Sequence, residues 1–144
     1  MPYSALGGSI RDIALKQSPD AFSVTDPCFA NARIAFNDDA RYRLRYRFSC
    51  AHEIGHLVLE HHPDECGIED EADYFAGYLL APHPIVLSIP EDSVASSLDI
   101  SADCAAVAVS QSRKRRAEAG PWRPHERRLI ENAVWKEGGH IAQR

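Results

Sequence analysis

Two histidines four residues apart, His52 and His56, enclose Glu53 in the run His52-Glu53-Ile54-Gly55-His56. On an α-helix this spacing places both imidazoles on one face, about one turn apart. Two neutral imidazoles so placed can bind one zinc ion at roughly 2.0–2.1 Å each. Glu53 points beside the metal, so its carboxylate can take a proton from a water molecule there. The pattern predicts a hydrolytic zinc site, whereas the alternative is a helix with two satisfied histidines and a surface glutamate.

A catalytic zinc ion needs a third protein ligand, and the acidic segment 69–73 supplies the candidates. Glu69 and Asp73 are four residues apart and share a helix face, whereas Glu71 points elsewhere. We therefore assign Glu69 as the ligand, with Glu71 as the less favoured choice. Asp73 then becomes an acceptor that orients a histidine ring, in the first place His52. The alternative for this segment is a solvated helix start, where acidic side chains suit the helix dipole.

The site requires two helices. Residues 41–48 alternate between basic and apolar side chains, which is a strand signal. Apolar or small residues also recur there at three- and four-residue steps: Leu44, Phe48, Ala51, Gly55 and Val58. We predict one helix from about residue 41 to about residue 60, in which glycine at position 55 allows a neighbouring strand or the substrate to approach closely.

A second helix is predicted from about residue 65 to residue 80, ended by Pro82 and Pro84. Its apolar face is made by Ala72, Phe75, Ala76, Leu79 and Leu80. Upstream, residues 9–16 predict a short helix with Ile10, Ile13 and Ala14 on one face. Residues 21–25 and 32–36 predict the strands of a hairpin, followed by a helix N-cap in residues 37–39.

Downstream, helices are predicted over residues 93–98, 101–117 and 126–136, with a break at residues 120–124 and a loose end from Gly138. The buried side of the last helix is predicted to comprise Ile130, Ala133 and Val134. The basic run 113–116 suits a helix C-terminus. A sharper reading makes residues 93–117 a DNA-binding helix-turn-helix.

Composition bounds the class of protein. The 144 residues carry a net charge of −5 and an apolar share of 44%, which is enough for one core and argues against direct nucleic-acid binding. The longest apolar stretch is too short for a membrane span, and the N-terminus lacks the features of a signal peptide. Four scattered cysteines form no Cys-x-x-Cys pair, which favours a reduced, cytoplasmic protein.

Two segments resemble a known family. Residues 47–59 (RFSCAHEIGHLVL) resemble the active-site helix of the ImmA/IrrE metallopeptidases, and residues 69–82 (EDEADYFAGYLLAP) resemble that family's second helix. The resemblance extends over about residues 20–115, with Ala81 in place of the usual methionine and Asp73 in place of the commoner asparagine. It implies a gluzincin-like fold, Zn²⁺ bound by His52, His56 and Glu69, and Glu53 as catalytic base.

The resemblance also implies a regulatory role, because family members act on helix-turn-helix repressors. We therefore expect an α+β fold, a mainly helical zincin-like domain with a small antiparallel sheet packed on the HExxH helix. That domain would span residues 1–120, with a helical extension over residues 121–144. The expected activity is zinc-dependent cleavage of a repressor or antitoxin-like regulator. The alternatives are a zinc-stabilised binding module that sequesters such a partner without cleaving it, and a DNA-binding regulator.

Overall fold

The computed structural model describes residues 1–26, 29–62 and 64–136. Residues 1–76 and residues 77–144 form two compact units, and the boundary between them falls within one helix. The first unit contains η1 (Tyr3–Ala5), α1 (Gly8–Gln17), β1 (Ala21–Asp26), β2 (Phe29–Phe36), η2 (Ala40–Tyr42), α2 (Arg43–Val58) and the start of α3 (Ile68–Leu80).

The second unit contains the end of α3 and a series of helices: α4 (His83–Val86), η3 (Glu91–Ser93), α5 (Val94–Leu98), α6 (Ala102–Ala119) and α7 (Pro124–Lys136). The expected fold class, mainly helical with a small antiparallel sheet, is confirmed. The predicted boundary at residue 120 stays a prediction, and the predicted loose end lies outside the described residues.

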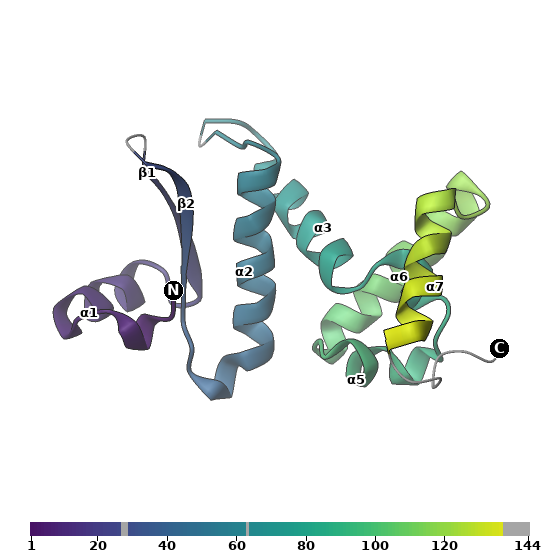
Figure 1. Cartoon of the computed structure of the whole chain (residues 1–144), viewed down its shortest axis with the longest axis horizontal. Helices are drawn as coiled ribbons and strands as arrows, with labels where there is room; N and C mark the ends of the chain where they lie inside the picture. The colour runs from purple at the N-terminus through teal and green to yellow at the C-terminus, as the bar shows by residue number, and fades with distance from the viewer. Residues whose placement is uncertain (27–28, 63, 137–144) are drawn as a thin grey trace. The chain divides into compact units, whose positions relative to one another are not determined.

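The sheet is the predicted hairpin, in which β1 pairs antiparallel with β2 and lies between α1 and α2 (Figure 1). Residues that are paired across the strands share a face, and successive residues alternate between faces. Phe22 and Ala35 belong to a small core with Tyr3 and Ala14 on the α1 side. On the other face, the ring of Phe36 stacks on that of Tyr46 of α2, with centroids 5.4 Å apart.

Helix α1 confirms the element predicted over residues 9–16, but its predicted buried face is wrong in part. Ala14 is buried, whereas Ile10 and Ile13 are 59% and 57% exposed. Leu15, which the face did not include, packs against the core beside Tyr3. The helical spacing of apolar residues identified an apolar stripe on this helix. Which face of the helix packs against the hairpin depends on tertiary contacts, and these cannot be inferred from the spacing.

Helix α2 settles the ambiguity of residues 41–48 in favour of helix. The segment begins with the 3₁₀ turn η2, where the side chain of Asp39 accepts a hydrogen bond from the backbone N–H of Arg41. Ala51 and Gly55 are buried as expected, while Val58 is 60% exposed. The buried face is therefore narrow, and it is made by the smallest residues of the helix.

The core of the second unit is formed by apolar side chains from α4, α5, α6 and the segments that connect the helices: Ala81, Val86, Val94, Ile100, Ala105, Ala108 and Val109. Helix α6 begins where predicted, with Ser101 Oγ accepting from the backbone N–H of Cys104. Leu79, expected in an apolar face, is 49% exposed.

None of the described helices is both long enough and apolar enough to cross a membrane.

The basic run at the end of α6 forms internal contacts. Arg115 pairs with Glu126 of α7 at 2.6 Å, and the side chains of Arg115 and Glu126 are largely buried. The guanidinium of Arg115 also lies over the ring of Trp122. Arg113 pairs with Glu91. The first turn of α6 carries Asp103, whereas a recognition helix contacts base edges with its N-terminal residues. These contacts favour a structural role for the run over reading DNA.

A buried polar pair joins α4 to α6. His83 and Ser112 are 2% and 0% exposed, and His83 Nδ1 lies 3.0 Å from Ser112 Oγ. Ser112 Oγ donates its own hydrogen to the carbonyl of Ala108 at 2.6 Å. The imidazole therefore donates from Nδ1 to the hydroxyl oxygen. Burial lowers the pKa of His83, and the nearby Arg115 lowers it further against an opposing effect of Glu126.

We expect His83 to make the free energy of unfolding depend on pH. Because its pKa is lowered in the folded chain, the unfolded chain binds more protons below the ordinary histidine pKa of about 6.5. The free energy of unfolding should therefore fall as the pH drops below that value, with no contribution from His83 above it. Urea denaturation at several pH values should show that the free energy of unfolding falls less steeply with decreasing pH in His83→Asn than in the parent protein. The amide of the asparagine can still donate to Ser112. Equal slopes for the two proteins would contradict this assignment.

Candidate metal centre

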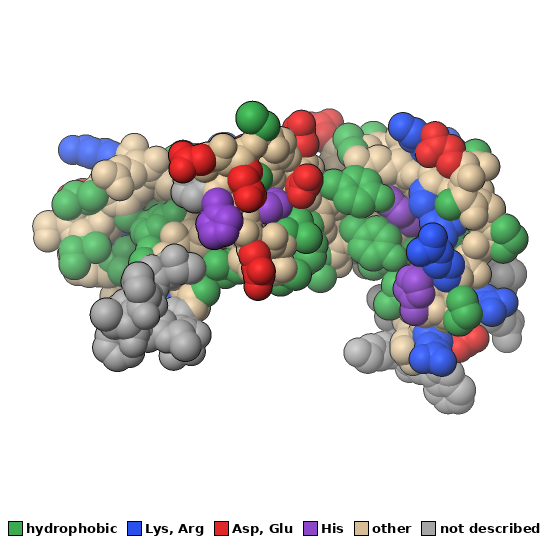
Figure 2. Space-filling model, turned by 90° about the horizontal axis from the view of Figure 1, so that it is seen from above, with side chains coloured by type: hydrophobic (Ala, Val, Ile, Leu, Met, Phe, Trp, Pro, Cys, Tyr) green, Lys and Arg blue, Asp and Glu red, His purple; other side chains and the backbone are tan. Residues whose placement is uncertain are grey.

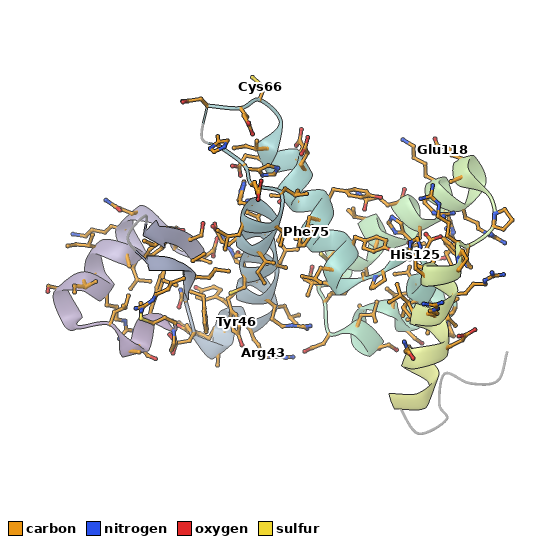
Figure 3. All side chains as sticks on the ribbon, turned by 45° about the horizontal axis from the view of Figure 1, so that its top comes forward. Arg43, Tyr46, Cys66, Phe75, Glu118 and His125 are labelled. Carbon is orange, nitrogen blue, oxygen red and sulfur yellow. The ribbon has the colours of Figure 1, made fainter. Side chains whose placement is uncertain are left out.

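Helices α2 and α3 lie close together at Gly55 and Ala72. A Cβ atom built on Gly55 would lie 3.2 Å from Ala72 Cα, 3.3 Å from its carbonyl oxygen and 3.1 Å from Cδ1 of Phe75. Figure 3 shows Phe75 on the side of α3 that faces α2. The close neighbour of Gly55 is thus the second helix, and not the strand or substrate that was expected. Glycine at this point lets the two helix backbones approach to near contact.

This approach brings together three residues whose types suit a metal ion. His52 Nε2 and His56 Nε2 are 2.9 Å apart. The two carboxylate oxygens of Glu69 lie 3.2 Å from His52 Nε2 and 3.5 Å from His56 Nε2. Figure 2 shows histidine side chains with acidic side chains around them on one face of the molecule. One donor atom from each of the three residues lies within 4.8 Å of the others.

The spacing of these atoms can be compared with a tetrahedral site. Ligands at about 2.0–2.1 Å from zinc are separated from each other by roughly 3.3 Å in tetrahedral geometry. The three separations of 2.9, 3.2 and 3.5 Å lie around that value. Two imidazoles and one carboxylate are also a donor set that catalytic zinc sites use. The residues present therefore fit the ion that the sequence predicts.

The two histidine rings differ in exposure from the carboxylate. The side chains of His52 and His56 are 17% and 16% exposed, whereas Glu69 is 73% exposed. The rings are thus held by the helix packing, while the carboxylate closes the cluster from the solvent side.

Each histidine ring has a further partner at its second nitrogen. His52 Nδ1 lies 2.8 Å from Asp73 Oδ1, the pairing that the four-residue spacing from Glu69 predicts. His56 Nδ1 lies 2.9 Å from His61 Nδ1, and His61 Nε2 lies 3.2 Å from Glu71 Oε2. The contacts of His61 and Glu71 with the cluster were not expected from the sequence.

Glu53 follows His52 in the same helix turn and is half-buried. Among the residues that the structure describes, its carboxylate has no hydrogen-bond or ion-pair partner. Its negative charge raises the pKa of the buried Tyr3 and of Cys50, although burial is the larger cause for both groups. The carboxylate is therefore free to accept a proton, as a general base must.

Other side chains with chemically useful groups have different surroundings. Burial raises the pKa of the Cys50 thiol, which disfavours the reactive thiolate and favours its reading as a small apolar side chain. Tyr78, His83 and Tyr74 could donate a hydrogen bond to an oxyanion by residue type, and the first two pack edge to face in the second unit. Tyr74 is 50% exposed. The geometry singles out none of them as a donor.

Comparison with known proteins gives one match. The sequence profile described as the IrrE N-terminal-like domain, a peptidase family, matches residues 5–107. The match includes α2 and α3 with every residue of the cluster, and it covers more than half of the chain. Neither the curated proteins nor the solved structures gave a match.

Proposed function

The chain belongs to the family of IrrE N-terminal-like domains, a peptidase family, and from that premise we propose that it is a zinc-dependent endopeptidase acting on a regulatory protein. The substrate class proposed is a helix-turn-helix repressor or an antitoxin-like regulator, whose cleavage would switch transcription, a mobile element or a stress response. The observation that carries the proposal is the cluster of His52, His56 and Glu69, with Glu53 next to His52 on the same helix.

In this proposal His52, His56 and Glu69 hold the metal. A bound zinc ion supplies Lewis acidity, which lowers the pKa of a water molecule and polarises a carbonyl group. Asp73 accepts the Nδ1 hydrogen of His52, at 2.8 Å, and so leaves Nε2 with the lone pair that faces Glu69. The side chains of the site thus have their proton positions set before a substrate arrives.

Glu53 carries the proton transfer. Its carboxylate accepts a proton from the attacking water and delivers it to the amine that leaves when the peptide bond breaks. A carboxylate held in an ion pair would be a poorer acceptor, and Glu53 is in none among the described residues. The half-buried position beside His52 suits this role, because the preceding residue of the helix fixes its distance from the cluster.

The direct test measures metal and cleavage in the same protein. Purified full chain should contain about one zinc ion per chain and should cut the helix-turn-helix protein encoded by a neighbouring gene, with fragments identified by mass spectrometry. Treatment with a chelator should abolish cutting, and added Zn²⁺ should restore it.

The outcomes separate the proposal from its alternatives. A protein that binds zinc and captures the regulator intact would be a binding module, and the proposed peptidase activity would be wrong. Absence of bound zinc under these conditions would overturn the metal site itself. A regulator that is cut equally well with and without chelator would contradict zinc dependence.

A further inference from the structure

We infer that His61 is a positioning residue for His56, with Glu71 behind it, and that this pair sets the zinc affinity of the site. The inference rests on the zinc site of the proposed function and adds two residues to it. It is carried by the chain of contacts His56 Nδ1 to His61 Nδ1, at 2.9 Å, and His61 Nε2 to Glu71 Oε2, at 3.2 Å.

The end of α2 brings His61 back over the helix. Glu60 adopts a left-handed conformation with φ of 56°, and the backbone N–H of His61 donates to the carbonyl of His56 at 3.0 Å. This six-to-one hydrogen bond with a left-handed residue is the Schellman ending of a helix. It turns the chain so that the rings of His61 and His56 meet edge to face, 5.1 Å apart.

The contacts fix where each proton lies. If His56 is to offer its Nε2 lone pair to a metal, its hydrogen must be on Nδ1, where it needs an acceptor. His61 Nδ1 supplies that acceptor, provided that the hydrogen of His61 is on Nε2. Glu71 lies at Nε2 and accepts that hydrogen. The three residues thus select one tautomer of each ring, and that tautomer is the metal-binding one.

In both proposed metal-binding histidines, the Nδ1 atom has a partner that orients the ring, but the two partners differ. Asp73 contacts His52 directly, whereas the carboxylate of Glu71 acts on His56 through one intervening imidazole. The side chain of His61 is only 5% exposed, so water does not readily replace it as the acceptor. Glu71 is 66% exposed and should contribute less. Asp73 and Glu71 both come from the first turns of α3, which also carries Glu69.

The test compares zinc affinities of full-length variants by competition with a chromophoric chelator. His61→Leu keeps a bulky apolar side chain but removes the acceptor, and it should weaken zinc binding by about 10- to 100-fold. His61→Asn places an amide oxygen near the position of Nδ1 and should stay within a few-fold of the parent. Glu71→Ala should lose less than His61→Leu, and it leaves the packed residues unchanged because Glu71 is a surface side chain.

Neighbouring surface residues provide matched controls. His62→Leu and Asp70→Ala alter exposed side chains of the same types and should leave zinc affinity unchanged. Wild-type affinity in His61→Leu would overturn the inference while leaving the proposed peptidase in place. Equal losses in His61→Leu and His61→Asn would also overturn it, because the ring would then matter for packing alone. Absence of zinc binding in the parent protein would instead refute the proposed function.

Bound Co²⁺ distinguishes a positioning residue from a direct ligand. The visible absorption of the Co²⁺ protein reports the number and kind of ligand atoms, which a positioning residue does not change. The spectrum of His61→Asn at saturating Co²⁺ should therefore keep the shape of the parent spectrum. A spectrum typical of a different ligand set would show that His61 itself coordinates the metal and would overturn the inference.

Discussion

Replacing Glu53 with glutamine should leave zinc binding intact and lower the rate of cleavage by about 10²- to 10⁴-fold, the range of a lost general base. The reason is geometric as well as chemical. The cluster contains His52, His56 and Glu69 but not Glu53, so the donor atoms should not change, whereas an amide cannot accept the proton. The measurement is kcat/KM for cleavage of the regulator, together with the zinc content of the same preparation.

A matched substitution just beyond the end of the same helix controls for this experiment. Glu60→Gln makes the same change of charge on an exposed side chain outside the cluster, and it should cut at the parent rate. Parent-level cleavage by Glu53→Gln would rule out its role as base. Loss of zinc from Glu53→Gln would show instead that the carboxylate contributes to holding the metal.

Local spacing predicted the parts of the site that lie on one helix. The four-residue interval places His52 and His56 on one face wherever the helix lies in the fold, and the same holds for Glu69 and Asp73. The two pairs meet only if the two helices pack against each other. In the packed structure the metal-ligand atoms of His52, His56 and Glu69 are 2.9–3.5 Å apart. The need of a catalytic zinc ion for a third protein ligand suggested that step, and the resemblance to a family with both motifs supported it, because periodicity alone cannot pair helices.

The contact of His61 with His56 could not be predicted in the same way. Five residues separate them, which is not a helical neighbour distance, and the contact depends on the left-handed conformation of Glu60. That conformation is favoured for glycine and costs energy in other residues. A glutamate at this position gives no sequence signal for it. The facing argument against Glu71 assumed that only one face of α3 meets the site, whereas Glu71 contacts the site through His61.

Burial was predicted less well than the positions of the elements. Ile10 and Val58 are more than half exposed, although they belong to apolar stripes. The close approach of α2 and α3 is made by small residues, and Ala51, Gly55 and Ala72 are buried. Where helices approach through such residues, the large apolar side chains flank the contact and remain partly open to solvent. Hydrophobic spacing therefore locates the helix but overestimates the width of its buried face.

Substituting leucine for Gly55 should displace α3 and weaken the metal site without touching a donor residue. Even a Cβ atom there would lie 3.2 Å from the Cα of Ala72, so a larger side chain must move the helix backbone. Overpacking costs about 1–3 kcal/mol, against about 1 kcal/mol gained by removing a helical glycine. We expect a lower free energy of unfolding and a zinc affinity reduced about 10-fold or more, since Glu69 and Asp73 move with the helix.

Gly77 offers the control for that experiment because it is also a helical glycine. A Cβ atom at Gly77 would have no neighbour closer than 4.0 Å, the side-chain oxygen of Gln111. Gly77→Ala should therefore be neutral or stabilising by up to about 1 kcal/mol and should bind zinc as the parent does. Urea denaturation and chelator competition measure both quantities for both variants. Parent-like zinc affinity in Gly55→Leu would mean that α3 can shift without moving Glu69, and the close approach at Gly55 would then not be what positions the third ligand.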